Sequence, residues 1–232
     1  MPIPPADDIP TGRKESATWE DVYSQNVEIA RRRRAMPAKL RRLGFHLANP
    51  QAAILDLCCG HGEALDALHE MGFRNLSGMD ISIPATLADD PRFTVRVGDV
   101  LQSGYSDASF SWILNFHALH HLGMEKQVGH FLDECYRMLK PGGRLSIIDF
   151  PASPQIYLAF WWLNKGWLLW SPYLENMSQV IREEMYFLKN YLPQWPRIMR
   201  LLYNGRFQVE SIQHGLFYFY LTLKKPHLET QD

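Results

Sequence analysis

The sequence has few cysteines, almost no net charge and no uninterrupted hydrophobic run long enough to span a bilayer. Its three cysteines lack the spacing of a zinc site, so no metal site is predicted and a reducing, cytoplasmic setting is expected. A formal net charge of -1 argues against a nucleic-acid partner, because phosphate neutralisation dominates such binding. Residues 1–18 lack the basic-then-apolar pattern of a signal peptide and are expected to form a disordered leader.

The composition suits one compact α/β domain that carries a lid. Hydrophobic residues make up 46% of the 232 residues and charged residues 21%, which is enough to build a sizeable core. We therefore expect a single domain over residues 19–232, with a helical cap at 19–48 and a helical insertion at 151–204.

The most informative segment is an apolar run that contains Asp56 and leads into a glycine-rich turn. The turn, Cys58-Cys59-Gly60-His61-Gly62, is followed by a helical pattern. Two glycines let the backbone turn sharply and approach a ligand closely, and the helix behind them points unpaired N–H groups at the same spot. The pattern predicts a nucleoside-binding loop; a plain strand-to-helix connection is the alternative.

Acidic residues follow the next two predicted strands. Asp80 lies twenty residues beyond Gly60, where a carboxylate can accept hydrogen bonds from both ribose hydroxyls. Capping the next helix is the alternative role, but Ser82 and Pro84 are predicted to start that helix. Asp99 follows the strand at 93–97, from where it can accept from an adenine amino group.

A fourth strand at 110–115 leads into a histidine-rich loop. A neutral imidazole of His117 or His120 could take a proton from a hydroxyl or an enol; packing within the loop is the alternative. An amphipathic helix at 125–139 follows, and Pro141-Gly142-Gly143 is predicted to stop it before a fifth strand at 144–149.

From Asp56 to Asp149 the chain resembles the class I S-adenosylmethionine-dependent methyltransferases. The family's acid-x-Gly-x-Gly-x-Gly motif appears with Cys58 at the first glycine position, and residues 139–143 resemble the loop before the family's fifth strand. The resemblance implies S-adenosyl-L-methionine as cofactor and a doubly wound, seven-stranded, mostly parallel sheet in which only the last strand is antiparallel. It implies these cofactor-binding residues: Tyr23, Asp56, Cys58, Gly60, Gly62, Asp80, Ile81, Asp99, Val100 and Asn115.

Two segments flank this core. The basic segment at 19–43 contains four consecutive arginines, Arg31 to Arg34. It is a candidate for peripheral membrane contact or for recruiting an acidic substrate, with a solvated helix as the alternative. The insertion between strands five and six is strongly aromatic, and it could roof an apolar acceptor pocket or form a homodimer interface.

The expected function is methyl transfer to oxygen or carbon of a small apolar or aromatic metabolite. The insertion loosely resembles that of ubiquinone and menaquinone C-methyltransferases, which implies a quinol-like, phenolic or polyketide-like acceptor. Two other functions stay open: a non-catalytic adenosine-binding module, and a nicotinamide-dependent oxidoreductase, which would more often have a third glycine at position 65.

Overall fold

A seven-stranded sheet forms the centre of the computed structural model, which describes residues 26–122, 125–164 and 187–227. The strand order is β3-β2-β1-β4-β5-β7-β6, and only β7 runs antiparallel to its neighbours, as the sequence predicts. The strands are β1 (Ile54–Leu57), β2 (Leu76–Asp80), β3 (Thr94–Val97), β4 (Phe110–Phe116), β5 (Leu139–Asp149), β6 (Gln208–His214) and β7 (Phe219–Lys224).

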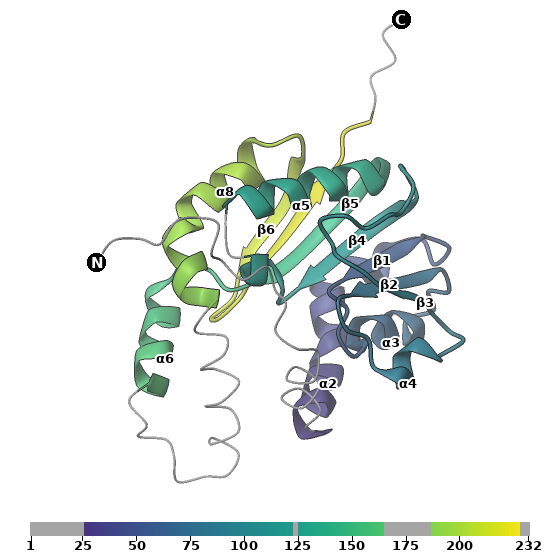
Figure 1. Ribbon diagram of the computed structural model, residues 1–232, viewed down its shortest axis with the longest axis horizontal. Coiled ribbons are helices and arrows are strands. Elements are labelled where there is room, and N and C mark those ends of the chain that lie inside the picture. Colours follow the sequence, from purple (N-terminus) through teal and green to yellow (C-terminus); the bar gives the residue numbers. More distant parts are fainter. Residues whose placement is uncertain (1–25, 123–124, 165–186, 228–232) are drawn as a thin grey trace, which may run out of the picture.

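Helices cover both faces of the sheet (Figure 1). On one face lie α2 (Asn26–Arg42), α3 (Glu63–Glu70) and α4 (Ala85–Ala88); on the other lie α5 (Glu125–Met138) and α8 (Trp195–Asn204). The helix α6 (Pro154–Asn164) extends from the end of β5. Short 3-10 turns lie at Phe45–Leu47, Leu119–Leu122 and Leu192–Gln194.

Each face of the sheet has its own hydrophobic core. Phe131 and Cys135 of α5 pack beside Leu145 of β5 in one cluster. In the other, Leu40 of α2 packs with the stacked rings of Phe45 and Trp112, whose centroids are 4.0 Å apart. The amphipathic helix predicted at 125–139 is α5, and its predicted apolar stripe is buried.

The structure differs from the sequence-based expectation at two element boundaries. The segment 140–143, expected as a loop, belongs to β5, because Gly142 N–H donates to Lys225 O and Lys225 N–H donates to Gly143 O. The helix expected to start at Ser82 starts instead at Ala85, with Pro84 at its N-cap and no side-chain cap.

The cap and the insertion are described only in part. The basic helix predicted at 19–43 is observed as α2 from Asn26 onward, and no described helix has the length and apolar character needed to cross a membrane. Tyr23, the leader and the insertion residues 165–186 lie outside the described residues.

Candidate functional site

The glycine-rich loop joins β1 to α3 with an unusual backbone. Cys58, Gly60 and Gly62 all have positive φ, at 62°, 51° and 78°. A cysteine in this conformation carries strain that glycine would not, since its Cβ crowds the backbone. A Cβ at Gly62 would lie 2.8 Å from Leu87 Cδ1, whereas a Cβ at Gly60 would meet no atom within 4 Å. The loop is therefore packed at Gly62 and open at Gly60.

Asp80 at the end of β2 holds this loop in place. Its Oδ2 accepts from Gly60 N–H at 2.8 Å, and its Oδ1 accepts from Ser82 N–H at 3.2 Å. Burial raises the pKa of Asp80, while the backbone donors, first of all Gly60, oppose that rise. Each carboxylate oxygen has a second lone pair, so Asp80 can still accept hydrogen bonds from two hydroxyl groups while it holds the loop.

Two more carboxyl groups are buried beside the loop. Asp56 is 3% exposed, and burial, Glu63 and then Asp80 raise its pKa well above the ordinary range. Glu63, the first residue of α3, is 8% exposed, and its Oε1 has no hydrogen-bond partner in the part of the chain that the structure describes. No sequence pattern marks Glu63 as a site residue, because an acid in the first turn of a helix is ordinary.

Asn115 of β4 faces the same region and has an unsatisfied acceptor. Its side chain is 1% exposed and its Nδ2 donates to Leu57 O at 3.3 Å. Its Oδ1 is buried and, within the described residues, receives no hydrogen bond. Because β4 pairs in parallel with β1, Asn115 follows the residue that lies beside Asp56.

The residues after β2 and β3 form a more open rim. Ile81 is 58% exposed and Asp99 is exposed, while Val100 is buried. Asp99 Oδ1 accepts from Leu101 N–H at 2.8 Å, and Gly98 N–H donates to Asp80 O at 2.8 Å. The predicted cofactor residues on or just after four strands, β1 to β4, thus lie at one edge of the sheet, the carboxyl edge, where open α/β sheets bind ligands.

The two candidate bases have different surroundings. His117 is half-buried, has a φ of 56°, and places Nε2 2.7 Å from Nζ of Lys39 in α2. An ammonium has no acceptor, so His117 Nε2 accepts this bond and the ring proton is on Nδ1. No sequence pattern predicts the pairing of His117 with Lys39, which is 78 positions away.

His120 is fully buried against a carboxylate. Its Nδ1 lies 2.7 Å from Asp149 Oδ1, and its backbone N–H donates to Asp149 Oδ2 at 3.1 Å. Tyr191 packs edge-on to the His120 ring; its hydroxyl is buried without a partner among the described residues. Asp149 was missed as a site residue, although it ends a strand as Asp80 does.

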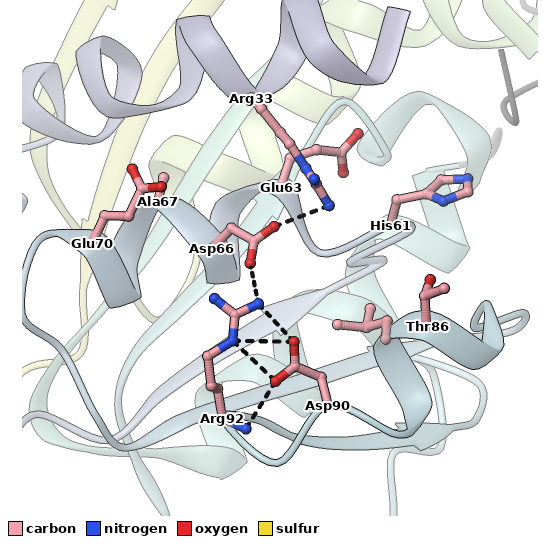
Figure 2. Close-up of a pocket in the computed structure, with 10 residues that line it drawn as sticks. Arg33, His61, Glu63, Asp66, Ala67, Glu70, Thr86, Asp90 and Arg92 are labelled. Atoms are coloured by element: carbon pink, nitrogen blue, oxygen red, sulfur yellow. Dashed lines mark hydrogen bonds and ion pairs between the residues drawn. The ribbon is translucent and has the colours of Figure 1, made fainter. Parts of the chain in front are cut away.

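A polar cavity of about 420 Å³ lies beside the loop, between α2, α3 and α4 (Figure 2). Arg33 reaches Asp66 from α2 at 3.1 Å, and Arg92 bridges Asp66 and Asp90 at 2.8 and 2.6 Å. The hydrogen bonds from Arg92 lower the pKa of Asp90 to about 2. These ion pairs join α2, α3 and the segment after α4 beside the loop.

Comparison with known proteins identifies the central part of the chain. Residues 55–147 match the family described as a methyltransferase domain. This segment, about two fifths of the chain, is similar to that family, which supports the resemblance to the class I S-adenosylmethionine-dependent methyltransferases. The match includes the glycine-rich loop, Asp80, Asp99, Asn115 and both candidate bases.

Two curated relatives of the methyltransferase domain have similar identities. A probable S-adenosylmethionine-dependent methyltransferase of Mycolicibacterium smegmatis is 31% identical over 93 residues, which cover 39% of this chain and 35% of that protein. A demethylmenaquinone methyltransferase of Lactiplantibacillus plantarum is 30% identical over 131 residues, covering 51% and 54%. The chain thus spans only about a third to a half of these relatives.

A solved structure shares the fold more completely. The 1,6-didemethyltoxoflavin-N1-methyltransferase of Burkholderia thailandensis superposes with a TM-score of 0.57 over 91% of this chain and 87% of that one, at 17% identity. This superposition shows a shared fold over 91% of the chain, so the likeness extends beyond the core to the flanking segments.

Proposed function

We propose that this chain binds S-adenosyl-L-methionine at the carboxyl edge of β1, β2 and β4 and transfers its methyl group to oxygen or carbon of a small apolar or aromatic molecule. The observation that carries the proposal is the set of unsatisfied polar groups at that edge. Buried acceptors without partners cost free energy unless a ligand or water satisfies them. Asn115 Oδ1 and Glu63 Oε1 are two such acceptors near the open loop.

The charges of the site suit this cofactor. Asp56, Glu63 and Asp80 are carboxyl groups in a partly buried space, so a ligand that brings an ammonium and a sulfonium would relieve their repulsion. We assign Asp80 to the ribose hydroxyls, and Asp56 and Asn115 to the amino-acid end, with Cys58 beside it.

The rim residues suit the base. The exposed Ile81 side chain and Val100 offer apolar surface against which a planar ring can pack, and Asp99 can accept from an amino group of that ring. The open surface at Gly60 leaves room for close approach, whereas a side chain there would fill it. Gly62 keeps the loop packed against Leu87.

When bound, the cofactor would supply an electrophilic methyl group on its sulfonium. A nucleophile of the acceptor would take this methyl group in line with the carbon–sulfur bond, and S-adenosylhomocysteine would leave. The chain contributes chiefly by holding the two partners in that line. The two candidate bases differ in their partners. Lys39 Nζ lies 2.7 Å from His117 Nε2, whereas the carboxylate of Asp149 would stabilise a protonated His120 ring.

The acceptor class rests on the apolar insertion and on the relatives. Tyr157 and Trp161 of α6 are exposed aromatic residues next to the end of β5, and the demethylmenaquinone and toxoflavin enzymes are named for small ring-containing acceptors. A quinol, phenol or polyketide-like acceptor is therefore the first class to screen.

Calorimetric titration with S-adenosylhomocysteine, with NADH as the control, tests the cofactor assignment. We expect micromolar binding of the first and none of the second, after which turnover is screened with the acceptor classes above. Binding of NADH alone would favour an oxidoreductase. Binding of S-adenosylhomocysteine without turnover of any acceptor would favour an adenosine-binding module.

A further inference from the structure

An arginine-rich stripe runs along the outer face of α2. Arg31, Arg34, Arg41 and Arg42 are exposed and recur at helical spacing, while Met36, Leu40 and Leu43 are buried on the opposite side of the helix and just beyond its end. Residues 31–42 include no acidic residue. We call these four residues the arginine stripe.

The end of the arginine stripe is joined to the β6–β7 turn. Arg42 Nε donates to Gln213 Oε1 at 2.8 Å, and Gln213 Nε2 donates back to Arg42 O at 3.3 Å. The same turn exposes two apolar side chains, Leu216 at 66% and Phe217 at 43%. Basic and apolar residues therefore share one continuous surface.

Two further segments expose apolar side chains. Leu47, just after α2, is 82% exposed, and on α6 Tyr157, Leu158 and Trp161 are 51%, 58% and 56% exposed. Figure 1 shows α2, the β6–β7 turn and α6 in the lower part of the view, with α5 and α8 above. Neighbouring exposed apolar side chains, such as Leu216 and Phe217, mark interaction surfaces more often than chance.

We propose that the arginine stripe and the β6–β7 turn dock the protein on an anionic lipid bilayer. Arginines beside apolar anchors are the combination that binds a membrane interface, with the cations at the headgroups and the apolar residues below them. A nucleic acid bound to the arginine stripe would place its phosphates against the apolar side chains of Leu216 and Phe217, which is unfavourable. A second copy in a two-fold contact would place the stripe against itself, bringing like charges together.

Vesicle flotation tests this docking directly. We expect the full chain to bind vesicles of phosphatidylcholine with phosphatidylglycerol but not of phosphatidylcholine alone, and to dissociate as salt is raised. Each arginine near an anionic surface contributes about fivefold, so Arg34→Gln with Arg41→Gln should weaken binding about twentyfold or more. The matched control is Arg197→Gln with Arg200→Gln on α8, which should leave binding unchanged.

A second pair of variants tests the apolar anchor. Leu216→Ser should weaken vesicle binding several-fold, whereas Tyr203→Ser, at a 44% exposed position on α8, should not. All these variants should still bind S-adenosylhomocysteine, so failure to dock is separable from failure of the proposed function.

Four results would overturn the docking proposal. One is absence of binding to the anionic vesicles, and another is equal weakening by the substitutions in the arginine stripe and by the control substitutions on α8. A third is loss of binding in the arginine variant while Leu216→Ser binds normally, which would assign the surface to a polyanion. The fourth is a dimer that Leu216→Ser dissociates, which would assign the surface to a second copy of the chain.

Discussion

At the scale of single residues, the site is shaped by carboxyl groups that the fold places in unfavourable surroundings. Asp56 has no room to be solvated and lies near two further acids, and Asp80 is largely buried while it anchors the loop. Burial of each carboxylate opposes folding, although the hydrogen bonds from Gly60 and Ser82 offset this cost at Asp80. Such costs are common where a ligand later satisfies the groups.

Replacing Asp80 by alanine should weaken binding of S-adenosylhomocysteine by about 1–3 kcal/mol, because two ribose hydroxyls lose their acceptor. The same change frees Gly60 N–H, so some loss of stability is expected as well. Asp80→Asn retains one oxygen and should weaken binding less. Calorimetry together with urea unfolding separates the effects, and unchanged affinity in Asp80→Ala would refute the ribose assignment.

Replacing Asp56 by asparagine should stabilise the free protein near neutral pH. The folded-state pKa of Asp56 is raised, so its carboxyl group ionises at a lower pH in the unfolded chain than in the folded protein. Above about pH 4 this ionisation favours the unfolded state. The native carboxyl therefore lowers stability above that pH and costs nothing below it. Urea unfolding at pH 7 should show a gain of at least about 1 kcal/mol in Asp56→Asn, and the gain should vanish below pH 4.

Cofactor binding provides the opposite readout for the same variant. If Asp56 receives the cofactor's amino group, Asp56→Asn should bind S-adenosylhomocysteine more weakly while it unfolds at higher urea. A variant that gains stability and keeps full affinity would place Asp56 outside the cofactor site.

At the scale of secondary-structure elements, the sequence predicts the strands well because most are short runs rich in apolar or β-branched residues, and those of β2, β3 and β5 end at or just before a glycine or an acid. β1, β2, β4 and the β6–β7 hairpin lie where the pattern predicts them, to within about two residues. The start of β5 was missed, since Lys140-Pro141-Gly142-Gly143 has the composition of a turn and its pairing partner, Lys225, is distant in sequence.

The same limit applies to the site. The loop and the acids after β2 and β3 follow from local pattern, but the pairs of Lys39 with His117 and of His120 with Asp149 join elements 78 and 29 positions apart. Which residue meets which across the sheet edge depends on how α2 and the histidine loop pack, and composition and periodicity carry no information about that.

The contact of the histidine loop with the end of β5 yields a prediction at this scale. Asp149→Ala should destabilise the protein by about 2–4 kcal/mol, since His120 and the backbone N–H groups of His120 and Phe150 lose a buried partner. Asp107→Ala, which removes an exposed partner of Arg137, should change stability little. Thermal unfolding of the two variants provides the comparison, and equal effects would contradict a structural role for the His120–Asp149 pair.

At the scale of the whole molecule, the central strands of the sheet are buried and the edge strand β3 is exposed to solvent. β1 and β4 are buried along almost their whole length, whereas β3 is an edge strand whose residues are mostly exposed. The proposed cofactor site uses the ends of both kinds of strand, so binding links a rigid part of the sheet to a looser one.

Hydrogen exchange with and without S-adenosylhomocysteine should report this link in two ways. Amides that exchange by local opening should slow only near the site, at residues 58–62, 80–82, 98–101 and 114–117, while those of α8 and β6 keep their rates. The slowest amides of β1 and β4, which exchange through global unfolding, should slow about a hundredfold at a ligand concentration near one hundred times Kd, because unfolding releases the ligand. Local slowing confined to α8 and β6 would place the ligand elsewhere, since no residue of the proposed site lies on those elements.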